Sequence, residues 1–140
     1  MLLKLSKKEI AAIEAALDIA LNGGGALVQS ADITARQGIP PRYLEPILQK
    51  LGRAGVLVGV RGPGGGYRLA RERRRITLWQ LVDAMRGEAE AEVSASLETL
   101  AHALADIETD LRARLDAVTI EELCWGKKPP ERGPRRDFVI

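Results

Sequence analysis

Apolar residues recur three or four positions apart along several stretches of the chain, which is the spacing of one face of an α-helix. The first stretch follows Ser6-Lys7-Lys8-Glu9, in which the serine hydroxyl and the glutamate side chain would cap a helix start reciprocally. Gly23-Gly24-Gly25 ends the stretch. The pattern therefore predicts a helix between these two signals, with an apolar face made of Ile10, Ile13, Leu17 and Leu21.

Two short helices are predicted next, joined by the tight turn Gly38-Ile39-Pro40. Ser30 can cap the first helix, over residues 31–37, and the second is expected over residues 41–54, where proline suits the first position. Pro46 should bend the second helix, because proline removes one backbone hydrogen bond. Its inward face comprises Tyr43, Leu44, Ile47, Leu48 and Leu51. Two short helices joined by such a turn are typical of a helix-turn-helix.

A β-hairpin is predicted directly after the second helix. Residues 56–60 form a β-branched run, and residues 67–70 alternate as a returning strand. Between them, Arg61-Gly62-Pro63-Gly64-Gly65-Gly66 is a turn of great backbone freedom. It is not a phosphate-binding P-loop, because no Gly-Lys-Ser/Thr follows and no helix begins there. A hairpin in this position is the wing of a winged helix. The glycines would let its tip enter a narrow groove with Arg61 at its front, and an ordinary flexible hairpin turn is the alternative.

The C-terminal half is predicted to be helical. A capping box at Thr77–Gln80 opens a helix that runs to about Met85, and residues 88–92 form an acidic linker. A long helix is expected from Ser94 to about Ala117, and a short last helix, capped by Thr119, ends near Trp125. The long helix carries an apolar stripe with three- and four-residue spacing, made of Leu97, Leu100, Leu104, Ile107, Leu111, Leu115 and Val118.

The fold class expected is mostly α with a small β-hairpin wing: a winged helix-turn-helix followed by a long C-terminal dimerisation helix. Residues 1–87 would form the DNA-binding domain and residues 88–125 the linker, the dimerisation helix and the last helix. The tail over residues 126–140 is rich in Pro, Gly, Lys and Arg and is expected to be disordered. The stripe on the long helix is either a dimer seam with a second copy or a surface folded back on its own domain.

Charge separates the two halves of the chain. Residues 1–75 carry 13 basic against 6 acidic side chains, and residues 76–140 carry 8 against 13. A basic N-terminal half favours a polyanionic partner. The first turn of the second short helix would meet base edges, and the arginines that follow the hairpin lie where a wing would meet the DNA backbone. The expected DNA-binding residues are Ser30, Pro41, Arg42, Tyr43, Glu45, Arg61, Gly62, Gly64, Gly65 and Arg68.

Catalysis, metal binding and membrane insertion find no support in the residues. No Ser/His/Asp spacing appears, so an enzyme is not expected. Cys124 and His102 are the only residues of their types and do not make a cluster site. Cys124 is a candidate for packing or for redox sensing. With one cysteine, no signal peptide and no apolar run of about 18–20 residues, a cytoplasmic protein without membrane contact is expected.

Several of these residues together resemble the IscR/NsrR/CymR family of bacterial regulators. The resemblance rests on Tyr43-Leu44-Glu45, on Ala54-Gly55, on the run from Val60 to Ala70 that includes Arg61-Gly62-Pro63-Gly64-Gly65-Gly66-Tyr67, and on Ile76-Thr77. It is close over residues 6–87 and extends to residues 94–125 in layout only. It implies a homodimer whose long C-terminal helices cross and whose winged domains each read half of a palindromic operator, with repression of transcription the usual outcome.

One departure from the family bears on cofactors. The iron–sulfur members carry three cysteines before the long helix, and here residues 88–97 contain none. We therefore expect no cofactor, with double-stranded DNA and a second copy of the chain as partners. The controlling signal stays open between an unknown small-molecule or protein effector and Cys124 oxidation. A winged-helix adaptor for protein–protein contacts is the alternative to a regulator.

Overall fold

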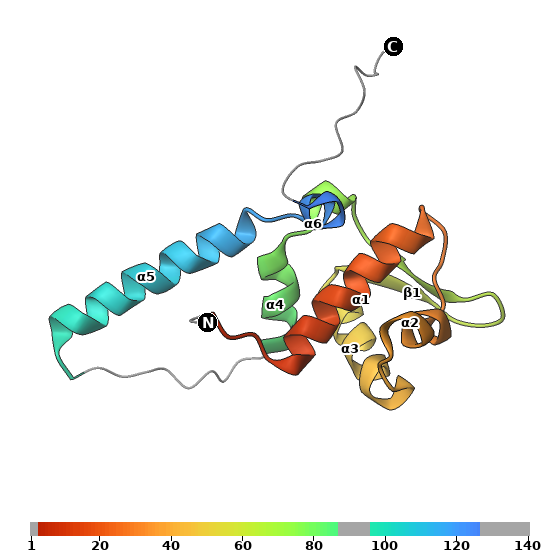
Figure 1. Ribbon diagram of the computed structural model, residues 1–140, viewed down its shortest axis with the longest axis horizontal. Coiled ribbons are helices and arrows are strands. Elements are labelled where there is room, and N and C mark those ends of the chain that lie inside the picture. Colours follow the sequence, from red (N-terminus) through yellow and green to blue (C-terminus); the bar gives the residue numbers. More distant parts are fainter. Residues whose placement is uncertain (1–2, 87–95, 127–140) are drawn as a thin grey trace, which may run out of the picture.

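The structure, a computed structural model, describes residues 3–86 and 96–126. Its elements follow the order α1 (Lys7–Gly23), α2 (Ser30–Gln37), α3 (Pro41–Arg53), β1 (Leu57–Val60), β2 (Gly66–Leu69), a 3-10 helix η1 (Arg73–Arg75), α4 (Leu78–Arg86), α5 (Glu98–Asp116) and α6 (Ile120–Trp125). Helices α1 to α4, the hairpin and α6 cluster together, and α5 extends away from them (Figure 1). The expected fold class is confirmed. The acidic linker and the tail from residue 127 lie outside the described residues.

Three helix starts are capped as their sequences indicate. The Ser6 hydroxyl accepts from the Glu9 amide at 3.1 Å, and the Ser6 amide donates to Glu9 Oε1 at 2.7 Å. Thr77 and Gln80 make the same reciprocal pair, at 3.2 and 3.1 Å. The Thr119 hydroxyl accepts from the Glu122 amide. Each bond satisfies backbone donors that a helix start leaves free, so these starts are fixed locally.

The expected cap at Ser30 is wrong. Helix α2 begins at Ser30 itself, and the residue before it, Gln29, is extended and makes no side-chain capping bond. The Ser30 carbonyl instead accepts a hydrogen bond from the Thr34 hydroxyl at 2.8 Å. The Gln29 carbonyl already accepts from the amides of residues 32 and 33, which moves the helix start one residue earlier than expected.

The buried face of α1 is made mainly of alanines, with Ile19 beside them. Ala12, Ala15 and Ala16 are fully buried, whereas Ile10 and Leu21 are 44% and 56% exposed. Alanine lets neighbouring backbones approach closely, and α1 contacts α2, α3, α4, β2 and α6 around this face. The apolar spacing identified the helix and, in Ile13 and Leu17, two residues that pack against the core, but not the alanines that are fully buried.

The hairpin is a short antiparallel pair that joins the core through a third segment. Leu57 pairs with Leu69 and Gly59 with Tyr67. Val28, before α2, exchanges two 2.8 Å backbone hydrogen bonds with Tyr67, which extends the pairing by one bridge. The hairpin is therefore anchored beside the helix-turn-helix, as a wing requires.

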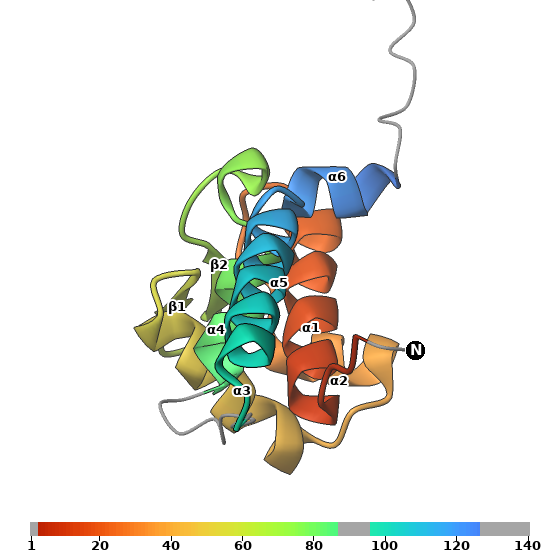
Figure 2. The same cartoon turned by 90° about the vertical axis from the view of Figure 1, so that its left-hand side faces the viewer.

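Backbone hydrogen bonds tie the C-terminal segment to the start of α4. The Leu78 amide donates to the Val118 carbonyl at 2.7 Å, and the Ile120 amide donates to the Ile76 carbonyl at 2.8 Å. Helix α6 packs on α1 and η1, and Ile120 is fully buried. Helix α5 begins at Glu98, later than the expected start at Ser94, which lies outside the described residues. A view along α5 places it in front of α1 and α4 (Figure 2).

Asp18 joins α1 to α2 through a buried carboxylate. Its side chain is 1% exposed and accepts from Arg36 at 2.7 to 3.2 Å and from Gln37 at 2.9 Å. Burial acts to raise the pKa of Asp18, but the hydrogen bonds and charge of Arg36, with Gln37, outweigh it and hold the pKa below its usual value. This pair fixes the helix that precedes α3 and so positions α3 itself.

Replacing Asp18 by Asn should destabilise the fold by about 2 kcal/mol at pH 7, since charged hydrogen bonds are lost in a buried place. Because the folded pKa is lowered, the carboxylate's contribution is present above the unfolded pKa, near 4, and is lost as pH falls through the folded value. Urea unfolding should therefore show a wild-type advantage at pH 7 that shrinks towards pH 3. Glu14→Gln, an exposed change on the same helix, is the control; an equal effect there contradicts the assignment.

Candidate nucleic-acid interface

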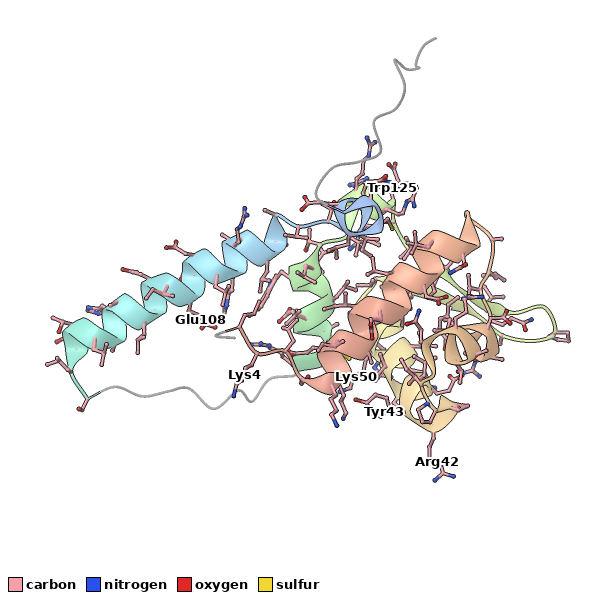
Figure 3. All side chains as sticks on the ribbon, in the orientation of Figure 1. Lys4, Arg42, Tyr43, Lys50, Glu108 and Trp125 are labelled. Atoms are coloured by element: carbon pink, nitrogen blue, oxygen red, sulfur yellow. The ribbon has the colours of Figure 1, made fainter. Side chains whose placement is uncertain are left out.

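The first turn of α3 presents its polar residues outward. Pro41 and Arg42 are exposed, and Arg42 projects from the end of the helix away from the molecule (Figure 3). Tyr43 and Glu45 are half-buried, and Tyr43 also packs against the core. The helix runs on through Pro46, and its opposite face is buried through Leu44, Ile47, Leu48 and Leu51. An anchored helix with an exposed first turn is what entry into a major groove requires.

A groove of about 870 Å³ lies between the second half of α3, the start of α2 and the hairpin. Of the expected DNA-binding residues, it brings together Ser30, Arg61, Gly62 and Gly65. Pro41, Arg42, Tyr43, Glu45, Gly64 and Arg68 do not line it. The expected set is thus divided between this groove, the exposed start of α3, the hairpin tip and, for Arg68, a different cleft.

Tyr67 connects α3 with the hairpin. Burial raises the pKa of Tyr67, the nearby charge of Glu45 raises it further, and Arg61 acts in the opposite direction. Its ring covers Gly59, where an added Cβ would lie 3.1 Å from the ring. Glu45 of α3 and Arg61 of the hairpin both influence this one hydroxyl, and Tyr67 lines the groove together with residues of the second half of α3.

The glycines at the hairpin tip are required by its geometry. Gly64 has φ +76°, in the left-handed region that L side chains rarely adopt. At Gly65 an added Cβ would lie 2.2 Å from the Val60 carbonyl oxygen. The turn is therefore tighter than a merely flexible loop, and it holds Arg61 at its front, exposed and without a hydrogen-bonding partner among the described residues.

Gln49 and Arg53 also line the groove, and the sequence analysis missed them. Both are exposed. They follow Arg42 by seven and eleven residues, which places all three on one face of a helix with 3.6 residues per turn. That spacing is the signal in the sequence that indicates these two residues.

Two of the arginines after the hairpin, Arg71 and Arg73, make contacts within the protein, and the expected contact of this arginine run with the DNA backbone stays a prediction. Arg71 donates to the Gly55 carbonyl at 2.8 Å and to Gln80 at 3.0 Å. Arg73 pairs with Glu121 of α6 at 3.3 Å and stacks on Trp125. Trp125 lies on the opposite side of the molecule from Arg42 (Figure 3). Arg71 therefore joins the turn before β1 to α4, and Arg73 joins η1 to α6.

Helix α5 leaves most of its apolar stripe uncovered. The exposed fractions are 63% for Leu97, 48% for Leu100, 40% for Leu104, 61% for Ile107 and 37% for Leu111. Leu115 is the exception: at 7% exposure it is buried within its own chain, so it does not belong to the expected interface. Helix α5 contacts α4, where Arg112 stacks on Trp79 at 5.2 Å, and the stripe itself has no such cover.

Cys124 is half-buried and packs against the core. Burial raises the pKa of its thiol, against the opposing effect of Arg73. A raised pKa disfavours the reactive thiolate, so the packing interpretation is favoured over redox sensing. In residues 3–86 and 96–126, no three His, Cys, Asp or Glu side chains come together to hold a metal ion. His102 is exposed on α5.

No helix within the part of the chain that the structure describes is long and apolar enough to cross a membrane. The anchored helix-turn-helix, the hairpin beside it and the cationic side chains on their shared surface define the chain as a winged-helix protein of the DNA-binding class.

Comparison with known proteins gives the same class of protein. The sequence profile of the Rrf2 family, described as "Iron-dependent Transcriptional regulator", matches residues 5–125. The regulator IscR of Vibrio atlanticus is 36% identical over 146 residues, which cover 99% of this chain and 84% of that protein. The structure of T. potens IscR has a TM-score of 0.75 at 28% identity, covering 94% and 93% of the two chains. CymR, the global cysteine regulator of B. subtilis, has a TM-score of 0.76 at 26% identity, covering 88% and 97%.

The chain belongs to the Rrf2 family of transcriptional regulators. It is a DNA-binding transcriptional regulator with a winged-helix fold, and its relatives are regulators rather than enzymes. The family description mentions iron, but the donors here do not fit an iron–sulfur cluster. The whole chain has one cysteine, and that thiol packs against the core.

Proposed function

We propose that the protein is a homodimeric repressor that binds a palindromic operator without an iron–sulfur cluster. The uncovered stripe on α5 supports the dimer most directly. Helix α5 has 19 residues and buries only Leu115 against its own chain. Its other leucines are exposed to water, and a second copy of the chain would cover them.

The operator's symmetry follows from that of the protein. Each chain has one α3 and one hairpin, and a two-fold dimer would set two such surfaces against two half-sites in opposite orientation. Within each half-site, Arg42 would enter the major groove first, and Gln49 and Arg53 would continue along the helix. Arg61 would reach the adjacent minor groove or backbone from the hairpin tip. Bound at a promoter, such a dimer blocks transcription.

Arg42, Arg53 and Arg61 make DNA binding depend steeply on salt, because each phosphate neutralised releases counterions. With about six phosphate contacts per dimer, affinity for duplex DNA should fall about 1,000-fold between roughly 50 and 200 mM salt. Fluorescence anisotropy of a labelled promoter duplex measures this. Weak binding with a flat salt dependence would favour the adaptor instead.

The same assay tests whether DNA binding depends on an iron–sulfur cluster. Protein prepared anaerobically with iron, and the same protein after iron chelation, should bind DNA with equal affinity, because one cysteine does not supply the thiolates that hold a cluster. A visible absorbance band that disappears together with DNA binding on chelation would contradict this part of the proposal.

A further inference from the structure

A second cleft, of about 700 Å³, lies on the other side of the hairpin from the α3 groove. One wall is the last turns of α1 and the glycine loop after it, and the other is the end of β2 with the segment that leads into η1. Glu121 of α6 closes one end. The volume lies within the range of small-molecule sites, about 300–1,000 Å³.

The cleft is cationic. Arg68, Arg71, Arg73 and Arg74 line it against two carboxylates, Glu72 and Glu121. Arg71 and Arg73 are held by the contacts described above, so their charges are fixed in position.

Two further guanidinium groups have N–H donors that no described residue accepts from. Arg68 is exposed and has no hydrogen-bonding or ionic partner among the described residues. Arg74 uses its Nε on Glu72 at 2.8 Å, and its terminal nitrogens have no partner within the same residues. Free guanidinium donors beside fixed positive charge favour an anion that accepts two parallel hydrogen bonds, as a carboxylate does.

The opposite wall is apolar. Ile19, Ala20 and Leu21 of α1 line it, and Leu21 is 56% exposed although it belongs to the helix that anchors the core. Ligand sites combine such apolar walls with a few placed polar groups. A ligand that satisfies both walls has a compact apolar body and an anionic head.

We propose that this cleft binds a small organic carboxylate, with its head on Arg68 and Arg74 and its apolar body against Leu21. The site is separate from the proposed DNA surface, because α6, which supplies Glu121, lies on the opposite side of the molecule from Arg42 (Figure 3). The cleft joins the root of the hairpin to α1 and α6, so an occupant would contact both the winged-helix elements and α6, which follows α5 in the chain. The proposal does not depend on the dimer or on the operator.

The test uses 1-naphthoate as the probe, an aromatic carboxylate of suitable size, titrated by calorimetry at constant ionic strength into the full chain. One molecule should bind per chain, saturably, with a Kd at or below the millimolar range expected for so small a ligand. Arg68→Ala and Leu21→Glu should each weaken binding about tenfold, from loss of a charged hydrogen bond and of the apolar wall.

The control is Arg75→Ala, which removes the same charge from an exposed arginine outside the cleft and should leave the Kd within about twofold. Absence of saturable binding overturns the proposal, and so does equal weakening by Arg75→Ala. Inorganic phosphate is titrated in parallel. If it binds as tightly as 1-naphthoate with the same dependence on Arg68, the cleft is a phosphate-binding patch and the carboxylate assignment is wrong.

Discussion

Replacing Leu104 by Glu should convert the protein to a monomer and lower its affinity for a full operator by about 100-fold. Leu104 lies in the middle of the uncovered stripe on α5, 40% exposed. A carboxylate in a dimer seam must be desolvated without a partner. Without the dimer, two half-sites no longer act together, and the avidity that linkage contributes, about 10²–10⁴-fold, is lost. Sedimentation velocity and anisotropy on the same sample measure the two effects.

His102→Glu is the matched control for this change. His102 is exposed on the same helix and lies about 160° around the axis from Leu104, at 3.6 residues per turn. It should remain a dimer with wild-type affinity. If Leu104→Glu is still a dimer, the interface lies elsewhere and the stripe needs another occupant. If both variants are monomers, added negative charge on α5 rather than the stripe is responsible.

Arg61→Ala should weaken operator binding by about 10- to 100-fold, the range of one good arginine contact with DNA. Arg61 stands at the front of a tip whose tightness depends on Gly65, and it has no partner within the described residues that would hold it back from DNA. Because it supports no packing, its loss should leave the melting temperature unchanged. Anisotropy with the same duplex and thermal unfolding together make the measurement.

Arg75→Ala is the comparison for that variant, because it removes the same charge from η1, which packs with α6 away from the groove. It should change affinity by no more than long-range screening allows, about twofold at moderate salt. Equal losses from Arg61→Ala and Arg75→Ala would mean that net charge, not the hairpin tip, determines binding. An Arg61→Ala protein with wild-type affinity would remove the hairpin from the interface.

Local signals in the sequence were enough for the capped starts of α1, α4 and α6 and for the hairpin, but not for the start of α2. The capping pairs at Ser6 and Thr77 each involve residues three positions apart, so the bonds that fix them are visible in the sequence. The hairpin likewise follows from glycines whose backbone the turn requires. The resemblance to the family rests in part on that same segment.

Contacts between distant segments could not be read in this way. The alanine face of α1 is buried because several elements converge on it, and spacing alone does not rank a face with Ala15 against one with Ile10. Arg71 and Arg73 belong to the arginine run that was expected near the DNA backbone, and the sequence did not indicate that they contact Gln80 and Glu121. The charge pattern of a sequence does not reveal which arginines form contacts within the folded protein.

The sequence predicted the type of site correctly, but it predicted only some of the residues that form it. Arg42 and Arg61 are exposed as expected, whereas Arg68 lies in the other cleft and Gln49 and Arg53 join the α3 groove. Strand pairing explains why Arg68 lies in the other cleft. Its partner across the hairpin is Val58, one residue along from the Gly59–Tyr67 pair, so Arg68 points to the opposite face of the sheet from Tyr67.

Selection of bound fragments from a genomic DNA library by the purified protein, at moderate salt, tests the central proposal most directly. A homodimer that reads one half-site per chain should enrich a palindrome whose half-site centres lie about 10 base pairs, or a multiple of that, apart. Retention that is weak, salt-labile and independent of sequence would contradict a sequence-specific repressor. It would leave the winged fold in place as an adaptor for protein contacts.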